Sequence, residues 1–160
     1  MSATREALRD LGAYIESKFG EQMDSQTLIN GELVVTISCQ NLLKLCKFLR
    51  DDSHCLFSQL IDICGVDFPE REKRFEVVYN LLSMKHNIRC RVKVIADADT
   101  TVPSVVSIWP AADWYEREVW DMYGVFFGDH PDLRRILTDY GFDGHPQRRD
   151  FVGSSMSPSN

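Results

Sequence analysis

The chain has 160 residues, a formal net charge of -6 and a hydrophobic fraction of 44%. This size and hydrophobic content fit one globular domain with its own core and exclude global disorder. The negative charge argues against a protein built mainly to bind nucleic acid or anionic lipid, and no apolar run is long enough for a transmembrane helix. The N-terminus has neither the apolar segment of a signal peptide nor the acid-poor composition of a mitochondrial presequence, which predicts a cytoplasmic protein.

The first hundred residues predict an α+β scaffold. A first helix begins after Ser2 and ends at Gly20, with one apolar face made of Leu8, Leu11, Ile15 and Phe19. Residues 21–31 are polar and are interpreted as a connection, with a turn at Asn30-Gly31. A second helix is predicted over 41–50, with one apolar face made of Leu42, Leu45, Cys46 and Leu49. Strands are predicted over 32–38, 56–67, 75–84 and 88–96. This order predicts helices packed on one face of a mixed or antiparallel sheet.

Two sets of residues, the cysteines and the basic residues of the last predicted strand, can each be interpreted as structural or as functional. The five cysteines form no CxxC pair and most lie in apolar runs, so buried reduced thiols are a better interpretation than an iron–sulfur or zinc site. Arg89, Arg91 and Lys93 alternate with apolar residues over 88–96. They form either a binding strip or a solvated strand face, and the alternation favours the solvated face.

A third helix is predicted between Pro110 and Gly124, because proline suits a first helical turn and glycine suits a helix end. A helical wheel predicts a scaffold-facing side made of Ala111, Ala112, Tyr115, Val119, Met122 and Tyr123. It predicts a water-facing side made of Asp113, Glu116, Arg117, Trp120 and Asp121. Two interpretations of Trp120 remain open: it anchors a protein interface, or the downstream chain folds back over it.

Trp114 and Glu118 lie at the margin of the apolar side of this helix. Glu118 is therefore expected to be partly buried and to need a cationic partner. The arginines that composition offers for it are Arg134, Arg135, Arg148 and Arg149. Glu116 and Glu118 point to different sides of the helix, so they cannot converge on one bond as an acid–base pair.

The sequence divides into a predicted α+β domain over 1–124, an extended partner-binding arm over 125–151 and a disordered tail over 152–160. Glycines and prolines break the periodicity of the arm, whose aromatic residues are Phe126, Phe127, Tyr140, Phe142 and Phe151. Extended segments rich in aromatic residues and arginine are typical of protein interfaces. His130 and His145 each precede a proline, and structural or interface roles suit them better than metal binding.

Several motifs of the helix and arm resemble one known family over some forty residues. They are Glu116-Arg117-Glu118, Asp121-Met122-Tyr123-Gly124, His130-Pro131-Asp132-Leu133-Arg134-Arg135-Ile136-Leu137, Gly144-His145-Pro146 and Arg148-Arg149-Asp150-Phe151. Their order and spacing are similar to those of the C subunit of bacterial NADH-quinone oxidoreductase, respiratory complex I. The family usually continues after the Asp-Phe pair with a proline-containing, acidic and aromatic segment, whereas here Val152 to Asn160 is small and polar.

The resemblance implies a hydrophilic subunit of the peripheral arm, at the cytoplasmic side of the inner membrane. It implies that this subunit packs on the D subunit of complex I and lies near cluster-bearing subunits. It also implies no catalytic residue, cofactor or metal in this chain, with FMN, iron–sulfur clusters and quinone held elsewhere in the assembly. Together with the motif residues above, Trp120, Tyr140, Gly141 and Phe142 are expected at the partner interface.

Two other functions remain as alternatives. One is the homologous subunit of a membrane-bound hydrogenase-type complex, which shares the motif. The other is a free-standing acid–base enzyme that would use Glu118 with His130 or His145, and it predicts turnover by the isolated chain.

Overall fold

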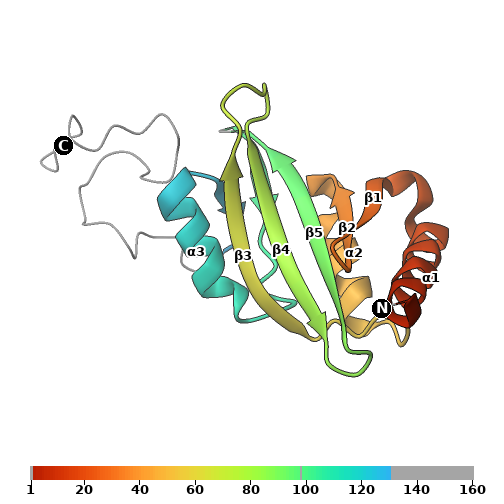
Figure 1. Cartoon of the computed structure of the whole chain (residues 1–160). Helices are drawn as coiled ribbons and strands as arrows, with labels where there is room; N and C mark the ends of the chain where they lie inside the picture. The colour runs from red at the N-terminus through yellow and green to blue at the C-terminus, as the bar shows by residue number, and fades with distance from the viewer. Residues whose placement is uncertain (1, 98, 131–160) are drawn as a thin grey trace, which may run out of the picture.

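The computed structural model describes residues 2–97 and 99–130, and it confirms an α+β architecture (Figure 1). The helices are α1 (Ser2–Phe19), α2 (Cys39–Asp51) and α3 (Ala112–Tyr123), with a short 3-10 turn at Gly20–Gln22. The strands are β1 (Met23–Ile29), β2 (Glu32–Ile37), β3 (Gln59–Asp67), β4 (Phe75–Ser83), β5 (Ile88–Ala96), β6 (Thr101–Pro103) and β7 (Phe126–Gly128).

Five strands form one mixed sheet in the order β1-β2-β5-β4-β3. The β2–β5 pair is parallel, and the β1–β2, β5–β4 and β4–β3 pairs are antiparallel. Figure 1 shows α1 beside the β1–β2 end of the sheet and α3 beside β3 at the opposite end. In the part of the chain that the structure describes, no helix is both long and apolar enough to cross a membrane.

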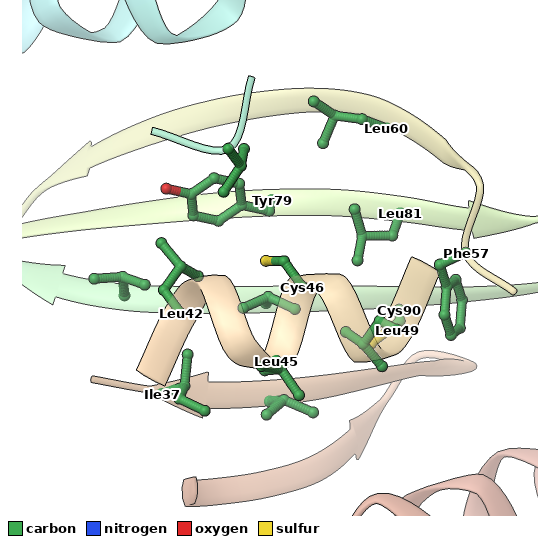
Figure 2. Close-up of a cluster of buried hydrophobic side chains, with 14 of the residues drawn as sticks. Ile37, Leu42, Leu45, Cys46, Leu49, Phe57, Leu60, Tyr79, Leu81 and Cys90 are labelled. Carbon is green, nitrogen blue, oxygen red and sulfur yellow. The ribbon is translucent and has the colours of Figure 1, made fainter. Parts of the chain in front are cut away.

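One face of the sheet carries the core, and α2 lies against its middle (Figure 2). The predicted apolar faces of α1 and α2 are buried, as are the inward residues of β4 and β5. These fully or almost fully buried residues include Leu8, Leu11, Ile15, Phe19, Leu42, Leu45, Cys46, Leu49, Phe75, Val77, Tyr79, Leu81, Cys90, Val92 and Val94. Burial of these apolar faces is the main favourable contribution to folding, at about 25 cal/mol per Å² of apolar surface.

The opposite face of the sheet carries the charged residues of β5, as the alternation in that strand predicts. Arg91 lies 3.4 Å from Glu32 and donates to Asn80, and Lys93 lies 3.8 Å from Glu76. Arg91 and Lys93 therefore pair with neighbouring strands. Of the five cysteines, Cys46, Cys55 and Cys90 are buried, Cys39 is half-buried and Cys64 is exposed. Cys64 is thus an exception to the expectation that most of the cysteines are buried.

The prediction of a polar connection over residues 21–31 is wrong, because Met23–Ile29 forms β1. This strand is mostly exposed and lies at the sheet edge, so its sequence lacks the apolar alternation that identifies a half-buried strand. Backbone pairing with β2 holds it in place. The predicted turn is confirmed: Asn30 and Gly31 have φ values of 50° and 79°, as a two-residue hairpin turn requires.

The segment directly after α3 packs on the domain. Residues 126–128 pair in parallel with β6, and Val125 and Phe127 are buried in the same core as the helices. The beginning of the predicted 125–151 arm is therefore packed in the domain through Phe127, because two of its apolar side chains complete the core. The remainder of the arm from residue 131, and the predicted tail over 152–160, lie outside the described residues.

Candidate partner interface around helix α3

Helix α3 begins two residues after Pro110 and ends at Gly124, close to the predicted bounds. Gly124 has a φ of 82°, and its N–H donates to the carbonyl oxygen of Trp120 at 2.8 Å. This left-handed conformation is favourable for glycine and ends the helix. Before the helix, Trp109 is buried and its indole Nε1 donates to the carbonyl oxygen of Phe57 at 3.0 Å. Together these contacts fix α3 against β3 and the core.

Glu116 is the buried polar centre of α3, with no exposed surface. Ser104 Oγ donates to its Oε1 at 2.6 Å, and the backbone N–H of Val105 donates to its Oε2 at 2.7 Å. The β6–β7 pair positions both donors, because Ser104 N also donates to the carbonyl oxygen of Gly128 at 2.9 Å. The carboxyl group therefore ties α3 to the segment that precedes it.

The pKa of Glu116 is raised from 4.5 to about 7, mainly by burial of the carboxyl group. The nearby Asp113 carboxylate also raises this pKa, while the hydrogen bonds from Ser104 and Val105 lower it. Desolvation disfavours the charged form of the carboxyl group, and it is the largest of these effects. Near neutral pH, Glu116 is consequently divided between its protonated and ionised forms.

His130 lies beside the same turn of α3, and its side chain is fully buried. Its Nε2 is 3.1 Å from the backbone oxygen of Asp113, 3.2 Å from Asp113 Oδ1 and 3.9 Å from Glu116 Oε1. Within the described residues, no group of three or more His, Cys, Asp or Glu side chains could hold a metal ion. The contacts of His130 are those of a structural histidine that fixes residue 130 to the N-terminal half of the helix.

Several assignments from the helical wheel are wrong. Ala111 was predicted on the scaffold-facing side, and it is exposed. Glu116 and Asp121 were predicted to face water, and both are fully buried. Glu116 follows Ala112 by one turn and precedes Val119 by three residues, so it lies on the packed side of the helix. A carboxylate tolerates such a position only when hydrogen bonds compensate its desolvation, and Ser104 and Val105 supply them. Asp121 lies toward the outer side, so its burial shows that this side of α3 is also partly covered.

The tryptophans of α3 are arranged differently from the prediction. Trp120 is half-buried and packs against the hydrophobic core. Trp114, predicted at the margin of the apolar side, is 49% exposed. Of these two tryptophans, Trp114 is therefore the one that offers aromatic surface to solvent. Whether the downstream arm also covers Trp120 depends on residues outside the described part of the chain.

We expect Trp120→Ala to lower the free energy of unfolding by about 2 kcal/mol, because it removes a large side chain from the edge of the core. Trp114→Ala should change it by less than about 0.5 kcal/mol, as is usual for surface positions. Urea denaturation of the two full-length variants, followed by circular dichroism, measures both values. Equal losses of stability would contradict this distinction.

Arg117 and Glu118 are half-buried and form no ion pair with any described residue. The Nε atom of Arg117 is buried and has no hydrogen-bond partner in the described part of the chain. The prediction that Glu118 is partly buried is confirmed, but its candidate partners Arg134, Arg135, Arg148 and Arg149 lie outside the described residues.

Glu118 borders a groove of about 400 Å³ between α3 and β3, which is lined by Ile63, Cys64, Gly65, Glu118, Val119, Met122 and Tyr123. Tyr123 packs closely on Gly65 at this groove. A Cβ atom at Gly65 would lie 2.6 Å from Tyr123 Cδ2, so glycine is what permits the contact.

The structure thus brings together Glu116, Arg117, Glu118, Trp120, Asp121, Tyr123, Gly124 and His130 of the predicted interface set. The remaining predicted residues lie outside the described part: Pro131, Leu133, Arg134, Arg135, Leu137, Tyr140, Gly141, Phe142, Gly144, His145, Pro146, Arg148, Asp150 and Phe151. The contribution of Ser104 and the outward position of Trp114 were not predicted. The outward position of Trp114 could have been inferred from its spacing of three and four residues from Arg117 and Glu118. Nothing in the sequence indicates that Ser104 bonds to Glu116.

Known proteins share this sequence and fold. Residues 35–157 match the family described as the respiratory-chain NADH dehydrogenase 30 Kd subunit. The NADH-quinone oxidoreductase C subunit of Paramagnetospirillum magneticum is 58% identical over 148 residues, which cover 91% of this chain and 74% of that protein. The NADH-quinone oxidoreductase C subunit of Rhizobium etli is 58% identical over 146 residues, covering 91% of this chain and 73% of that protein.

Two solved structures have similar folds. A trypsin-resistant fragment of Nqo5 aligns with a TM-score of 0.63 and 28% identity, over 77% of this chain and 98% of the fragment. A chain of the membrane-bound sulfane sulfur reductase, an archaeal respiratory membrane complex, aligns with a TM-score of 0.75 and 26% identity, over 90% of this chain and 85% of the other. From the family match and the relatives named above, this chain belongs to the family of the respiratory-chain NADH dehydrogenase 30 Kd subunit.

Proposed function

We propose that the chain is a non-catalytic, hydrophilic subunit of the peripheral arm of NADH-quinone oxidoreductase, held at the cytoplasmic side of the inner membrane through its partners. In this role it packs against the D subunit of the complex and against neighbouring cluster-bearing subunits. The assembly transfers electrons from NADH through FMN and iron–sulfur clusters to quinone and couples this transfer to proton translocation. These cofactors would be held by other subunits.

The observation that carries the proposal is that adjacent motif residues of α3 differ in whether they have partners within the described domain. Glu116 is satisfied by Ser104 and Val105, so its carboxyl group holds the helix in place. Arg117 and Glu118, in contrast, are half-buried and have no ion pair among the described residues. One part of the motif therefore fixes the helix, and the adjacent part is available to another protein. This division suits an assembly subunit.

The alternative of a free-standing acid–base enzyme is not favoured by the geometry. It requires Glu118 to act with His130 or His145. His130 has a fully buried side chain that contacts Asp113, whereas Glu118 borders the groove against β3. A general acid and base must reach the same substrate, and this separation does not support it. His145 lies outside the described residues.

A subunit of a hydrogenase-type membrane complex remains the second candidate. The observation in its favour is the similarity of fold to a chain of the archaeal sulfane sulfur reductase. The relatives named for NADH-quinone oxidoreductase are more than twice as identical in sequence, which favours the quinone-reducing complex.

We expect a tagged copy expressed in its own host to co-purify from detergent-solubilised membranes with the other peripheral-arm subunits. Deletion of the gene should remove most NADH-dependent quinone reduction from the membranes, and the tagged copy should restore it. Mass spectrometry of the purified sample identifies the partners. Recovery of the chain alone, or with the subunits of a hydrogenase-type complex, would contradict the first proposal.

A further inference from the structure

The outer surface of α3 carries three adjacent residues that the fold itself does not require. Trp114, Arg117 and Glu118 are spaced at i, i+3 and i+4, so their side chains are neighbours on the helix. We call them the outer α3 surface. Trp114 is 49% exposed, and the other two are half-buried. Tryptophan and arginine are among the residue types most enriched at the energetic centres of protein interfaces.

Arg117 is the informative member of this surface because its Nε atom is buried and lacks a hydrogen-bond acceptor among the described residues. Leaving a buried polar atom unpaired is unfavourable. Asp113 and Asp121 lie one helical turn before and after Arg117, yet no ion pair joins either of them to it. Asp113 is directed to His130 at 3.2 Å. The terminal nitrogens of the guanidinium group are not among the buried unpaired atoms and have no acidic partner in the described domain, so a carboxylate from outside it can pair with them.

The surroundings of Arg117 indicate that a protein segment supplies this carboxylate. Trp114 offers apolar surface on one side of it. On the other side, Glu118 borders the groove whose wall includes Ile63, Val119 and Met122. A free anion would use the arginine alone and would be repelled by Glu118. A peptide segment can place an acidic residue at Arg117, a basic residue at Glu118 and an apolar side chain in the groove.

We propose that the outer α3 surface docks a segment of a neighbouring subunit that carries a carboxylate for Arg117 beside a basic and an apolar residue. The inference rests on the proposed function, since it names the chemistry by which this subunit contacts a partner. Trp114 covers the ion pair and excludes water from it, as neutral contacts do around the centre of an interface.

The test uses the full-length tagged chain expressed in its host. Arg117→Glu reverses the charge. Arg117→Lys keeps the charge but loses the planar guanidinium group, which can bind a carboxylate through two hydrogen bonds. Arg89→Glu is the matched control, because Arg89 is exposed on β5 and has no ion pair with described residues. We expect Arg117→Glu to reduce co-purification of the complex by about 10-fold or more, as expected for disruption of a desolvated charge pair. Arg117→Lys should give a smaller loss, and Arg89→Glu should resemble the wild type.

A photo-crosslinking amino acid at position 114 identifies the occupant, with position 84 as the exposed control. A crosslink to an acidic segment of another subunit supports the proposal, provided that changing its acidic residue to lysine restores the Arg117→Glu variant. A crosslink to residues 131–160 of this chain overturns it. Wild-type co-purification by Arg117→Glu also overturns it and leaves the proposed function standing. If neither the wild-type chain nor the Arg89→Glu variant co-purifies with other subunits, the result contradicts the proposed function itself, on which this inference rests.

Discussion

Glu116→Gln should make the chain more stable than the wild type above pH 7 and about equally stable at pH 4.5. The glutamine amide has the shape of the protonated carboxyl group. Its oxygen can accept from the Val105 N–H, and its NH₂ group can donate to Ser104 Oγ. The variant thus keeps both hydrogen bonds while removing the charge that the buried site disfavours.

The direction of the effect follows from the raised pKa of Glu116. The folded chain retains the proton up to about pH 7, whereas the unfolded chain loses it near 4.5. Between these values the unfolded state binds fewer protons, so the free energy of unfolding of the wild type falls as pH rises. The contribution is fully present below pH 4.5, and about 3 kcal/mol of it is lost above pH 7. The wild-type-minus-variant difference isolates this contribution from those of other titrating groups.

Urea denaturation at intervals between pH 4.5 and 8 measures the difference. Glu118→Gln is the matched control on the same helix, because it removes a carboxylate that neither Ser104 nor Val105 binds. Glu116→Ala should lose about 3 kcal/mol at pH 4.5, because it leaves a cavity and an unpaired buried Val105 N–H. A Glu116→Gln curve parallel to the wild type would mean that Glu116 ionises in the folded chain as it does in water.

Apolar periodicity was sufficient to predict most of this fold. The faces of α1 and α2 are predicted residue by residue, because Leu8, Ile15, Leu42 and Leu49 repeat at helical spacing and are buried. The β4–β5 hairpin is predicted in the same way, because apolar side chains recur at every second residue in both strands. In both cases the side chains that identify the element are the ones that stabilise it.

The errors occur where backbone or polar contacts replace apolar ones. β1 is held by its pairing with β2 and offers no apolar pattern. Glu116 is buried because Ser104, twelve positions earlier, is brought to it by the β6–β7 pair. Such a pairing depends on tertiary structure, so a helical wheel that considers residue type alone places the carboxylate in water. The candidate interface was found from its motif, but which of its residues face outward required the structure.

The second large effect is expected at the contact between β3 and α3. Gly65→Ala should lower the free energy of unfolding by about 3 kcal/mol, at the upper end of the usual cost of overpacking. The added Cβ would lie 2.6 and 2.7 Å from two ring atoms of Tyr123. The ring also packs edge-on against Phe75 with centroids 6.4 Å apart, so moving it away from Gly65 disturbs this second contact. Urea denaturation of the full-length chain measures the loss.

Gly12→Ala is the control for Gly65→Ala, because its Cβ would meet mainly the end of the flexible Gln26 side chain, at 2.8 Å. Alanine also favours the helix there, so the net change should be within about 1 kcal/mol. In a Tyr123→Ala background the clash is absent, and Gly65→Ala should then cost less than about 0.5 kcal/mol. An undiminished cost in that background would place the strain in β3 itself. If Gly65→Ala costs almost nothing in the Tyr123→Ala background, the contact of the Tyr123 ring with Gly65 sets the position of α3. It then also sets the surface that this subunit presents to its partners.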